Sequence, residues 1–245
     1  MNNYQLKITA DGSYTLHSPL YDKDCHSLFG AKSETEIYYL AGCEILSKLQ
    51  QQKSINILEV GFGIGLGLIT TYEKTSALDL PVHFVSLEID QKLIEFVIHQ
   101  GILKDFSVEK KSNSIEVTKN KFSAKILIGD ARDTLPNFND FKFHAIYQDA
   151  FSPKKNAILW TVEWFRLLKE KSFSDTLLST YSASSSIRKS LIEAGWAVRN
   201  GPKFSGKKSS TVASPSGISE EDIINHLKRS PVPTIWDETH IEFAI

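Results

Sequence analysis

Residues 58–67, LEVGFGIGLG, decide the fold, because an apolar run typical of a buried strand ends directly in four glycines at alternate positions. We expect a strand at 55–60, a tight turn at the glycines and a helix from about residue 65 onward. Glycine adopts backbone angles that other residues avoid, and its missing side chain lets a ligand lie against the main chain at the start of the helix. A glycine-rich turn also forms without a ligand, so both alternatives stay open at this point.

Strands and helices alternate along the chain after this turn. Parallel neighbouring strands need a crossover helix, so the alternation predicts an α/β fold, Rossmann-like and doubly wound, with a mostly parallel sheet covered by helices on both faces. Ligands of such sheets bind beyond the carboxyl ends of the strands. The polar, lysine-rich segment 104–123 lacks periodicity, and we expect a surface excursion there. The expected strands lie at 83–87, 125–128, 144–148, 176–180, 196–199 and 210–213, and the expected helices at 65–74, 91–100, 157–168 and 184–194.

Residues 1–52 are expected to form an extension that packs on the main domain, residues 53–245, which is predicted to be a single globular unit. Two short alternating segments around an Asp-Gly pair near the start of the chain predict a β-hairpin. Ser33 and Glu36 form a capping-box pattern before apolar residues at helical spacing. We therefore expect one amphipathic helix that ends near Gln51.

The composition of the 245 residues is that of a soluble globular protein, with 41% hydrophobic and 23% charged residues. The net charge of -1 gives no global attraction to nucleic acid, so any polyanion site must be a local patch. Cys25 and Cys43 are too few for a disulfide framework and lack metal-ligand spacing, which predicts a reducing compartment and no metal. No export signal and no stretch of about 20 apolar residues is visible. We expect a cytoplasmic protein that does not contact membranes.

The glycine pattern discriminates between two cofactor classes. A dinucleotide fingerprint of the form Gly-x-Gly-x-x-Gly fails in every register, because the last glycine is missing each time. The pattern acid-x-Gly-x-Gly-x-Gly is complete, and it resembles the first motif of class I S-adenosylmethionine-dependent methyltransferases. That resemblance implies S-adenosylmethionine as the cofactor, held at Glu59, Gly61, Gly63 and Gly65.

Acidic residues follow the next two strands. Glu88 lies one strand–helix–strand step after the glycines, where a ribose presents its hydroxyls, and we expect it to bind them. Asp90 is expected to cap the next helix, because an aspartate there accepts from free backbone N–H groups. Asp130 ends the third strand, where methyltransferases of this class commonly keep an acidic residue near the adenine amino group. A helix cap is an equally good interpretation of Asp130.

Asp149 follows the fourth strand, at the crevice where the methyl group of the cofactor should emerge. An aspartate between apolar residues at this edge of a sheet usually binds a ligand or caps a helix. Here the following residues, 151–153, read Phe-Ser-Pro and continue as a loop, so no cap is expected. We predict that Asp149 contacts the cofactor and is the catalytic residue.

Residues 147–160, YQDAFSPKKNAILW, are similar to a signature of one methyltransferase family. The signature, Asp-Gly-Phe-Ala-Pro-x-x-Asn-Pro-x-x-Trp, belongs to the tRNA 5-methylaminomethyl-2-thiouridine methyltransferases, which occur free-standing or fused to an FAD-dependent oxidoreductase. Segments 26–35, 181–195 and 229–237 resemble further parts of that family, so the resemblance covers roughly residues 21–237. The chain ends too early for an attached oxidoreductase, which implies the free-standing form.

The chain departs from the family pattern at two places. Ala157 replaces the proline after Asn156, and residues 206–210, GKKSS, stand where the family has Gly-Lys-Arg-Glu-Met. Both departures concern the expected tRNA contacts more than the cofactor site.

The resemblance implies methyl transfer to the aminomethyl nitrogen of 5-aminomethyl-2-thiouridine at the tRNA wobble position, giving 5-methylaminomethyl-2-thiouridine. Asp149 would orient the amine and accept its proton. The implied partners are tRNA and, as a candidate, a separate FAD-dependent oxidoreductase that acts upstream. The residues expected on the substrate side are Glu34, Phe151, Tyr181 and Lys207. Glu34 fits a first-turn helix carboxylate equally well, and Tyr181 a packed aromatic residue.

Basic and aromatic residues are further candidates for RNA contacts. A phosphate-binding rim is one interpretation of the lysines and arginines near the predicted site, although each can also be an ordinary solvated charge. Aromatic rings near the methyl donor would serve as platforms for a flipped base. The candidate rim consists of Lys154, Lys155, Arg188, Lys189, Arg199, Lys203, Lys207 and Lys208, and the candidate platforms are Phe29, Phe151 and Phe204.

Three other functions remain compatible with the sequence. A polyamine aminopropyltransferase uses the same kind of turn, and so does a methyltransferase that acts on a small-molecule amine. A cofactor-binding module without catalytic activity is the third, although the complete acidic and glycine positions disfavour it.

Overall fold

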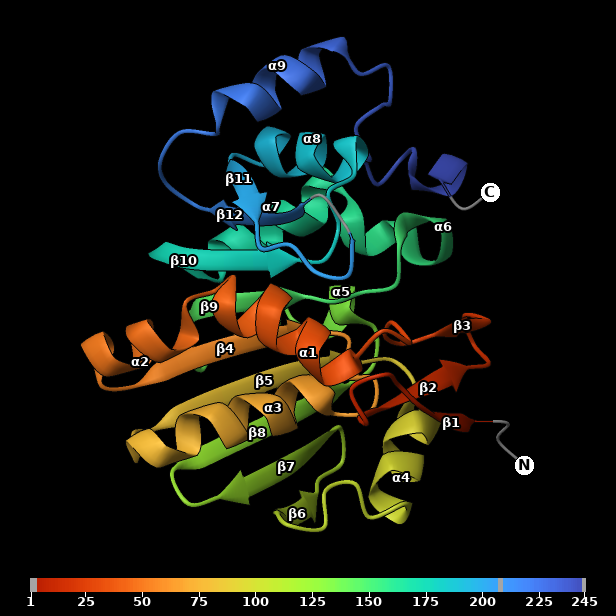
Figure 1. Ribbon diagram of the computed structural model, residues 1–245, viewed down its shortest axis with the longest axis vertical. Coiled ribbons are helices and arrows are strands. Elements are labelled where there is room, and N and C mark those ends of the chain that lie inside the picture. Colours follow the sequence, from red (N-terminus) through yellow and green to blue (C-terminus); the bar gives the residue numbers. More distant parts are fainter. Residues whose placement is uncertain (1–3, 207–208, 244–245) are drawn as a thin grey trace.

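A computed structural model describes residues 4–206 and 209–243 of the chain (Figure 1). Its centre is a nine-stranded sheet with the order β11-β12-β10-β9-β4-β5-β8-β7-β6. The five central strands are parallel, as the alternation of strands and helices predicts. These parallel strands are β4 (Ile55–Val60), β5 (Val82–Glu88), β8 (Phe122–Ile128), β9 (Phe143–Gln148) and β10 (Ser172–Thr180).

Both edges of the sheet are antiparallel. β6 (Ser107–Lys110) and β7 (Ser114–Lys119) extend one edge, and β11 (Ala197–Gly201) and β12 (Ser210–Ser214) extend the other. The expectation of a surface excursion at 104–123 is therefore wrong. β7 lies between β8 and β6, and its two apolar residues, Ile115 and Val117, are both buried. Two apolar positions give too weak a periodicity to detect from sequence.

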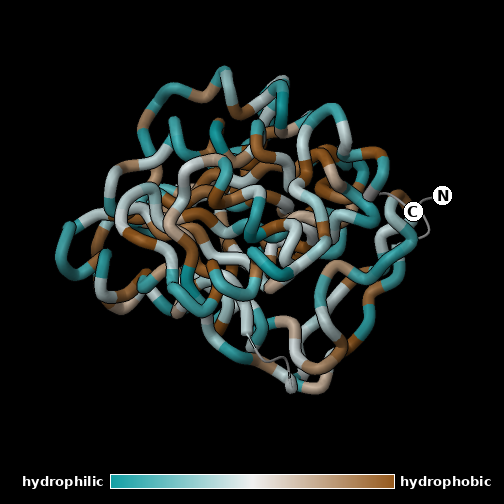
Figure 2. The backbone as a smooth tube through the Cα atoms, turned by 90° about the horizontal axis from the view of Figure 1, so that it is seen from above, coloured by the Kyte–Doolittle hydropathy of each residue, from teal (hydrophilic) through white to brown (hydrophobic). Residues whose placement is uncertain are grey.

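Helices cover both faces of the sheet, and β4 shows why its sequence is almost continuously apolar. Ile57 packs into the core on one face and Leu58 into the core on the other. Figure 2 shows apolar segments in the interior of the molecule and hydrophilic ones along the outer loops. The helices after the glycine turn are α3 (Leu66–Thr75), α4 (Gln91–His99), α5 (Ala131–Thr134), α6 (Pro153–Asn156), α7 (Val162–Glu170), α8 (Ser185–Glu193) and α9 (Glu221–Arg229), with 3-10 turns η2 (Ser76–Leu78), η3 (Ala157–Trp160) and η4 (His240–Phe243).

The N-terminal segment forms a small sheet of three antiparallel strands, β1 (Gln5–Ile8), β2 (Tyr14–Ser18) and β3 (Lys23–Asp24), which contains the predicted hairpin. Figure 1 shows this sheet beyond one end of the central strands, at the right of the view. None of the helices in the described part of the chain has the length and apolar character that crossing a membrane requires.

The predicted single helix near residues 33–51 is divided into three parts. α1 (Ala31–Thr35) continues as a π-helix, η1 (Glu36–Ala41), and α2 (Ile45–Gln52) follows after a break at Glu44, whose φ is 56°. Ser33 does not cap the helix, because it lies inside α1 and its hydroxyl donates to Asp11. Helical spacing of apolar residues cannot distinguish a π-helix from an α-helix, so the sequence pattern predicted one continuous α-helix where the structure has a π-helix after α1.

Candidate active site

A cavity of about 630 Å³ lies at the carboxyl edge of the parallel strands. Its size is within the range of small-molecule and cofactor sites, about 300–1,000 Å³. The walls come from the residues that follow β4, β5, β8 and β9, and from the N-terminal segment around β3 and the start of α1. This is the edge at which ligands of open α/β sheets bind.

The glycine turn after β4 brings bare backbone to the cavity at Gly61 and Gly63. Gly61 has a φ of 100°, and a Cβ atom there would lie 3.0 Å from the carbonyl oxygen of Asp149. Gly65 does not line the cavity; it precedes α3 in a left-handed conformation, and a Cβ atom would meet the Phe62 ring at 2.9 Å. These three glycines therefore serve two purposes: Gly61 and Gly63 border the cavity, and Gly65 lets the chain enter α3.

Glu59 lies beneath the glycine turn and outside the cavity wall. Its side chain is buried and accepts a hydrogen bond from the Ser86 hydroxyl at 2.6 Å. A Cβ atom on Gly67 would lie 1.8 Å from Oε1 of Glu59, so this glycine provides the space for the carboxyl group. Burial, and to a lesser extent the charges of Asp149 and Glu88, raise the pKa of Glu59 well above its usual value. The contacts are those of a residue that supports the turn from below.

Glu88 borders the cavity next to the turn. Its Oε2 accepts from the backbone N–H of Gly63 at 3.1 Å, and its Oε1 accepts from that of Asp90 at 2.9 Å. Burial raises the pKa of Glu88 to about 7, although these backbone donors act in the opposite direction. Asp90 caps α4 as predicted, accepting from the backbone N–H of Leu93 at 3.2 Å. The carboxylate of Glu88 is thereby fixed in direction at the cavity wall.

Asp130 lines the cavity and also caps a helix. Its Oδ1 accepts from the backbone N–H of Arg132 at 2.8 Å, at the start of α5. The two interpretations of this residue from sequence are therefore compatible with each other, because the cap directs the carboxylate while the residue stays at the cavity wall.

Asp149 stands at the end of β9, and residues of the N-terminal segment surround its carboxylate. Oδ1 accepts a hydrogen bond from the Tyr39 hydroxyl at 2.5 Å, and Oδ2 lies 3.6 Å from Nε2 of His26. Burial lowers the pKa of His26 to about 4, so its imidazole is neutral near pH 7. Burial, and secondly the charge of Asp149, raise the pKa of Tyr39 well above its usual value. The Tyr39 hydroxyl therefore keeps its proton and acts as a hydrogen-bond donor.

The structure brings three of the four predicted substrate-side residues to the same cavity: Glu34, Phe151 and Tyr181 all line it. Glu34 accepts from the backbone N–H of Ser27 at 2.9 Å, and the Tyr181 hydroxyl donates to the carbonyl of Ala150 at 3.1 Å. Lys207, the fourth, lies outside the described residues, as does Lys208.

Aromatic rings meet at the cavity wall. The ring of Phe151 lies 4.4 Å from that of Tyr21 between centroids, and both residues line the cavity. Phe29 is 73% exposed and does not line it, and Phe204 packs edge-on against Tyr38. Of the three predicted platforms, only Phe151 is therefore at the cavity.

Two members of the expected phosphate-binding rim have structural roles instead. Arg188 is buried, donating to the Thr211 hydroxyl at 2.9 Å and the Ser210 carbonyl at 2.8 Å. The ammonium of Lys189 donates to the carbonyls of Ser230 and Val232. The strand that carries Ser210 and Thr211 is among those predicted from sequence, but its packing against Arg188 is a tertiary contact that the sequence does not reveal. Lys154, Lys155 and Lys203 are exposed, and Arg199 pairs with Glu44.

Sequence reasoning missed Tyr39 and Tyr21 and gave His26 no role. Tyr39 occupies an apolar position of an amphipathic helix, which is typical of a core residue, and no local pattern connects it to Asp149, 110 positions away. His26 stands beside Cys25, but burial raises the pKa of that thiol, so the pair is not an activated nucleophile. The described residues contain no group of three or more potential ligands arranged to hold a metal ion.

Comparison with known proteins agrees with this architecture. A family model described as S-adenosyl-L-methionine-dependent methyltransferase matches residues 95–216. The crystal structure of MnmC2 from Aquifex aeolicus superposes with a TM-score of 0.77 at 31% sequence identity, covering 98% of this chain and 81% of that one.

Curated relatives are similar over most of this chain. The tRNA 5-methylaminomethyl-2-thiouridine biosynthesis bifunctional protein MnmC of Burkholderia mallei (strain SAVP1) is 28% identical over 220 residues, and that of Burkholderia multivorans is 29% identical over 217 residues. Each alignment covers 81% of this chain and 33% of the relative, so the chain spans about one third of the length of these proteins.

The fold and the site define a class I methyltransferase that uses S-adenosylmethionine. Within that class, the chain belongs to the family of the MnmC2 methyltransferases. The residues present fit the cofactor, because Gly61 and Gly63 leave side-chain-free backbone at the cavity and Glu88 presents a carboxylate whose direction two backbone donors fix.

Proposed function

We propose that this methyltransferase acts on the aminomethyl nitrogen of 5-aminomethyl-2-thiouridine at the wobble position of tRNA. The observation that carries the proposal is the environment of Asp149. Its carboxylate lies at the cavity with a second carboxylate, Glu34, and the hydroxyls of Tyr39 and Tyr181 nearby, an arrangement that suits an amine which arrives with a positive charge. The names of the MnmC relatives support tRNA as the carrier of that amine.

The cofactor half of the cavity would hold S-adenosylmethionine through three kinds of contact: bare backbone, a ribose contact and an adenine contact. Gly61 and Gly63 offer the backbone at the turn, and Gly65 lets the chain enter α3. Glu88 would accept from the ribose hydroxyls, and Asp130 from the adenine amino group. Glu59 acts indirectly, because it supports the turn from beneath.

When bound, the cofactor supplies an electrophilic methyl group on a positively charged sulfur. The protein must hold the acceptor nitrogen in line with that methyl group, and such positioning supplies roughly 7–11 kcal/mol of barrier reduction. The amine must also lose a proton, so that its lone pair is available. We assign this step to Asp149, whose carboxylate accepts the proton directly or through a water molecule.

Asp149 needs a fixed direction for this role. The hydrogen bond from Tyr39 holds Oδ1, which leaves Oδ2 toward the neutral His26. The neutral imidazole of His26 adds no positive charge beside this carboxylate. The buried hydroxyl of Tyr39 keeps its proton and therefore stays a donor to this carboxylate.

The substrate base would have to leave its stack to reach the cavity, as in other enzymes that act on a single nucleobase. Phe151 and Tyr21 provide aromatic surface at the cavity wall, and Glu34 and Tyr181 provide polar groups. Lys154 and Lys155 are exposed on α6, which begins two positions after Phe151, and we assign them to RNA phosphates together with Lys207. A separate FAD-dependent oxidoreductase that prepares the amine is a proposed partner.

The decisive experiment compares acceptors. We expect the purified protein to methylate tRNA that carries 5-aminomethyl-2-thiouridine, and nucleoside mass spectrometry of the digested tRNA to show 5-methylaminomethyl-2-thiouridine. Fully modified tRNA and small primary amines are the controls. Higher kcat/KM with a small amine, or transfer of an aminopropyl group, would replace the proposal with one of those functions. Binding of S-adenosylhomocysteine without any transfer would indicate a non-catalytic module.

A further inference from the structure

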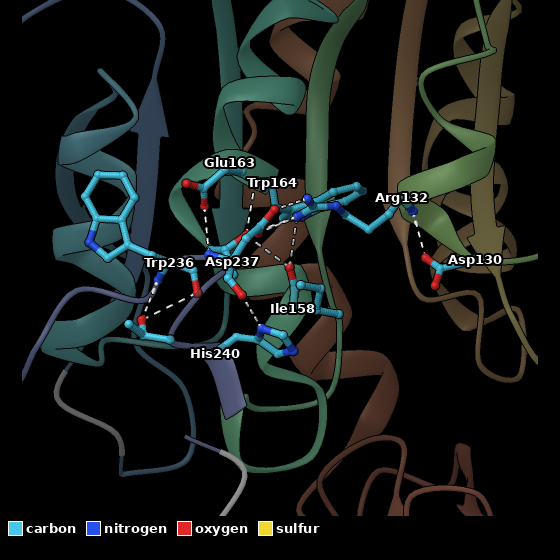
Figure 3. A network of polar contacts seen from close by, with 10 residues as sticks. Asp130, Arg132, Ile158, Glu163, Trp164, Trp236, Asp237 and His240 are labelled. Atoms are coloured by element: carbon cyan, nitrogen blue, oxygen red, sulfur yellow. Dashed lines mark hydrogen bonds and ion pairs between the residues drawn. The ribbon is translucent and has the colours of Figure 1, made fainter. Parts of the chain in front are cut away.

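The guanidinium of Arg132 connects three parts of the chain behind the cofactor cavity (Figure 3). It pairs with both carboxylate oxygens of Asp237, with Nη1 to Oδ1 at 2.9 Å. Nη1 also donates to the Thr161 hydroxyl at 3.1 Å and approaches the carbonyl of Ile158. We call Arg132, Thr161 and Asp237 the clasp.

The segment that carries Asp237 is itself firmly attached. The backbone N–H of Asp237 donates to Oε2 of Glu163 at 3.0 Å, at the start of α7. Ile235 is completely buried, and its carbonyl accepts from the backbone N–H of Val162 at 2.9 Å. Figure 3 shows Glu163, Trp236 and His240 around Asp237. The segment is therefore a fixed support from which Asp237 can hold Arg132.

The clasp lies directly behind two walls of the cavity. Arg132 is the second residue of α5, and the two residues before it, Asp130 and Ala131, line the cavity. On its other side, Ile158 and Leu159 of η3 also line it. Arg132 and Asp237 do not line the cavity themselves. Any effect that they have on a ligand must therefore act through the lining residues of α5 and η3.

α5 depends on such support because it has only four residues. A helix this short has too few internal hydrogen bonds to stabilise itself. Burial alone would raise the pKa of Asp237, but hydrogen bonds, above all that from Arg132, lower it, so the carboxylate stays ionised. A two-pronged contact between guanidinium and carboxylate also fixes orientation, which a single contact does not.

We infer that Arg132 and Asp237 are positioning residues for the cofactor: the C-terminal segment, through the clasp, sets where Asp130 and the η3 wall stand against the adenosyl group. The inference rests on the placement of that group proposed above and is independent of the identity of the acceptor. It assigns to a segment 105 positions distant in sequence a part in cofactor affinity.

Calorimetric titration with S-adenosylhomocysteine tests the inference on the full chain. We expect Asp237→Asn, which keeps the shape and removes the charge, to weaken binding about three- to thirtyfold. Arg132→Lys, which keeps the charge and loses the two-pronged contact, should have an intermediate effect. In kinetics, KM for S-adenosylmethionine should rise by the same factor while KM for the acceptor stays constant, a split that general loosening of the fold would not produce.

Asp79→Asn is the matched control, because it breaks another aspartate ion pair, with Lys121 at 2.7 Å, whose residues do not line the cavity. It should leave the affinity unchanged. Affinity within twofold of the wild type in Arg132→Lys and in folded Asp237→Asn would overturn the inference, and so would equal rises of both KM values. Failure of the wild-type chain to bind the ligand would instead overturn the proposed cofactor site.

Discussion

The cavity has two halves that are built in different ways: a cofactor half at Gly61, Glu88 and Asp130, and an acceptor half around Asp149. Gly61 directly follows β4, Glu88 is the last residue of β5 and Asp130 comes two positions after the end of β8, so the strands alone bring them to one edge. Asp149 also follows a strand, but its partners Tyr39 and His26 come from the N-terminal segment. Residues placed by chain continuity can be identified one at a time, whereas a cluster assembled by packing is visible only in the folded molecule.

Asp149→Asn should give the largest loss of activity, and it should affect the acceptor half of the cavity without weakening cofactor binding. We expect kcat to fall about 10²- to 10⁴-fold, because an amide cannot accept the proton of the amine. Binding of S-adenosylhomocysteine, measured by calorimetry, should change little. Undiminished kcat in this variant would remove the assigned role, and equal losses in kcat and ligand affinity would show that the two halves are not separable.

Gly61→Ala should weaken ligand binding in the cofactor half of the cavity. A Cβ atom at this position lies 3.0 Å from the carbonyl oxygen of Asp149, at a φ of 100° that side chains disfavour. We expect ligand affinity to fall about 10- to 100-fold through backbone displacement. Gly12→Ala is the control, because its φ is also positive, 78°, but its Cβ atom meets nothing within 4 Å. Equal effects of both variants on affinity would contradict a local origin.

Tyr39→Phe tests the acceptor half more finely, because it removes a single hydroxyl that the N-terminal segment brings to Asp149. Loss of a hydrogen bond to a charged group should lower kcat about 10- to 30-fold with KM for S-adenosylmethionine unchanged. The hydroxyl donates to Oδ1 of Asp149, so its loss should act on kcat through that carboxylate. A kcat equal to that of the wild type would mean that Tyr39 only fills space.

The smallest expected effect is a pH dependence in the cofactor half. Because burial raises the pKa of Glu88 to about 7, ribose hydroxyls should find the ionised carboxylate only above that pH. Affinity for S-adenosylhomocysteine should rise by at most about tenfold between pH 6 and pH 8. Glu88→Gln should flatten this profile, and a wild-type affinity independent of pH would argue against the ribose contact.

The same carboxyl group affects the stability of the free protein in the opposite direction. Its pKa is higher in the folded than in the unfolded chain, so its stabilising contribution is complete below pH 4.5 and is lost as the pH rises through about 7. Urea unfolding of the ligand-free protein at several pH values, with Glu88→Gln as the comparison, measures this contribution.

Several elements could be predicted from sequence for a physical reason. The strand Ile55–Val60 has the boundaries expected from its apolar run, and the Asp90 cap is recognisable because a cap is a local contact. The break at Glu44 and the antiparallel strand Ser114–Lys119 were missed, because each depends on packing against other elements. Arg188 looked like a surface charge, and only the strands around it show that it is buried.

By itself, the sequence determined the parallel sheet, the glycine turn and the class of cofactor, because covalent adjacency to buried strands places those residues. Only the tertiary structure decided which side chains meet Asp149 and that Asp237 reaches Arg132. These contacts join positions 110 and 105 residues apart, and they form only when the sheet and both ends of the chain have packed together.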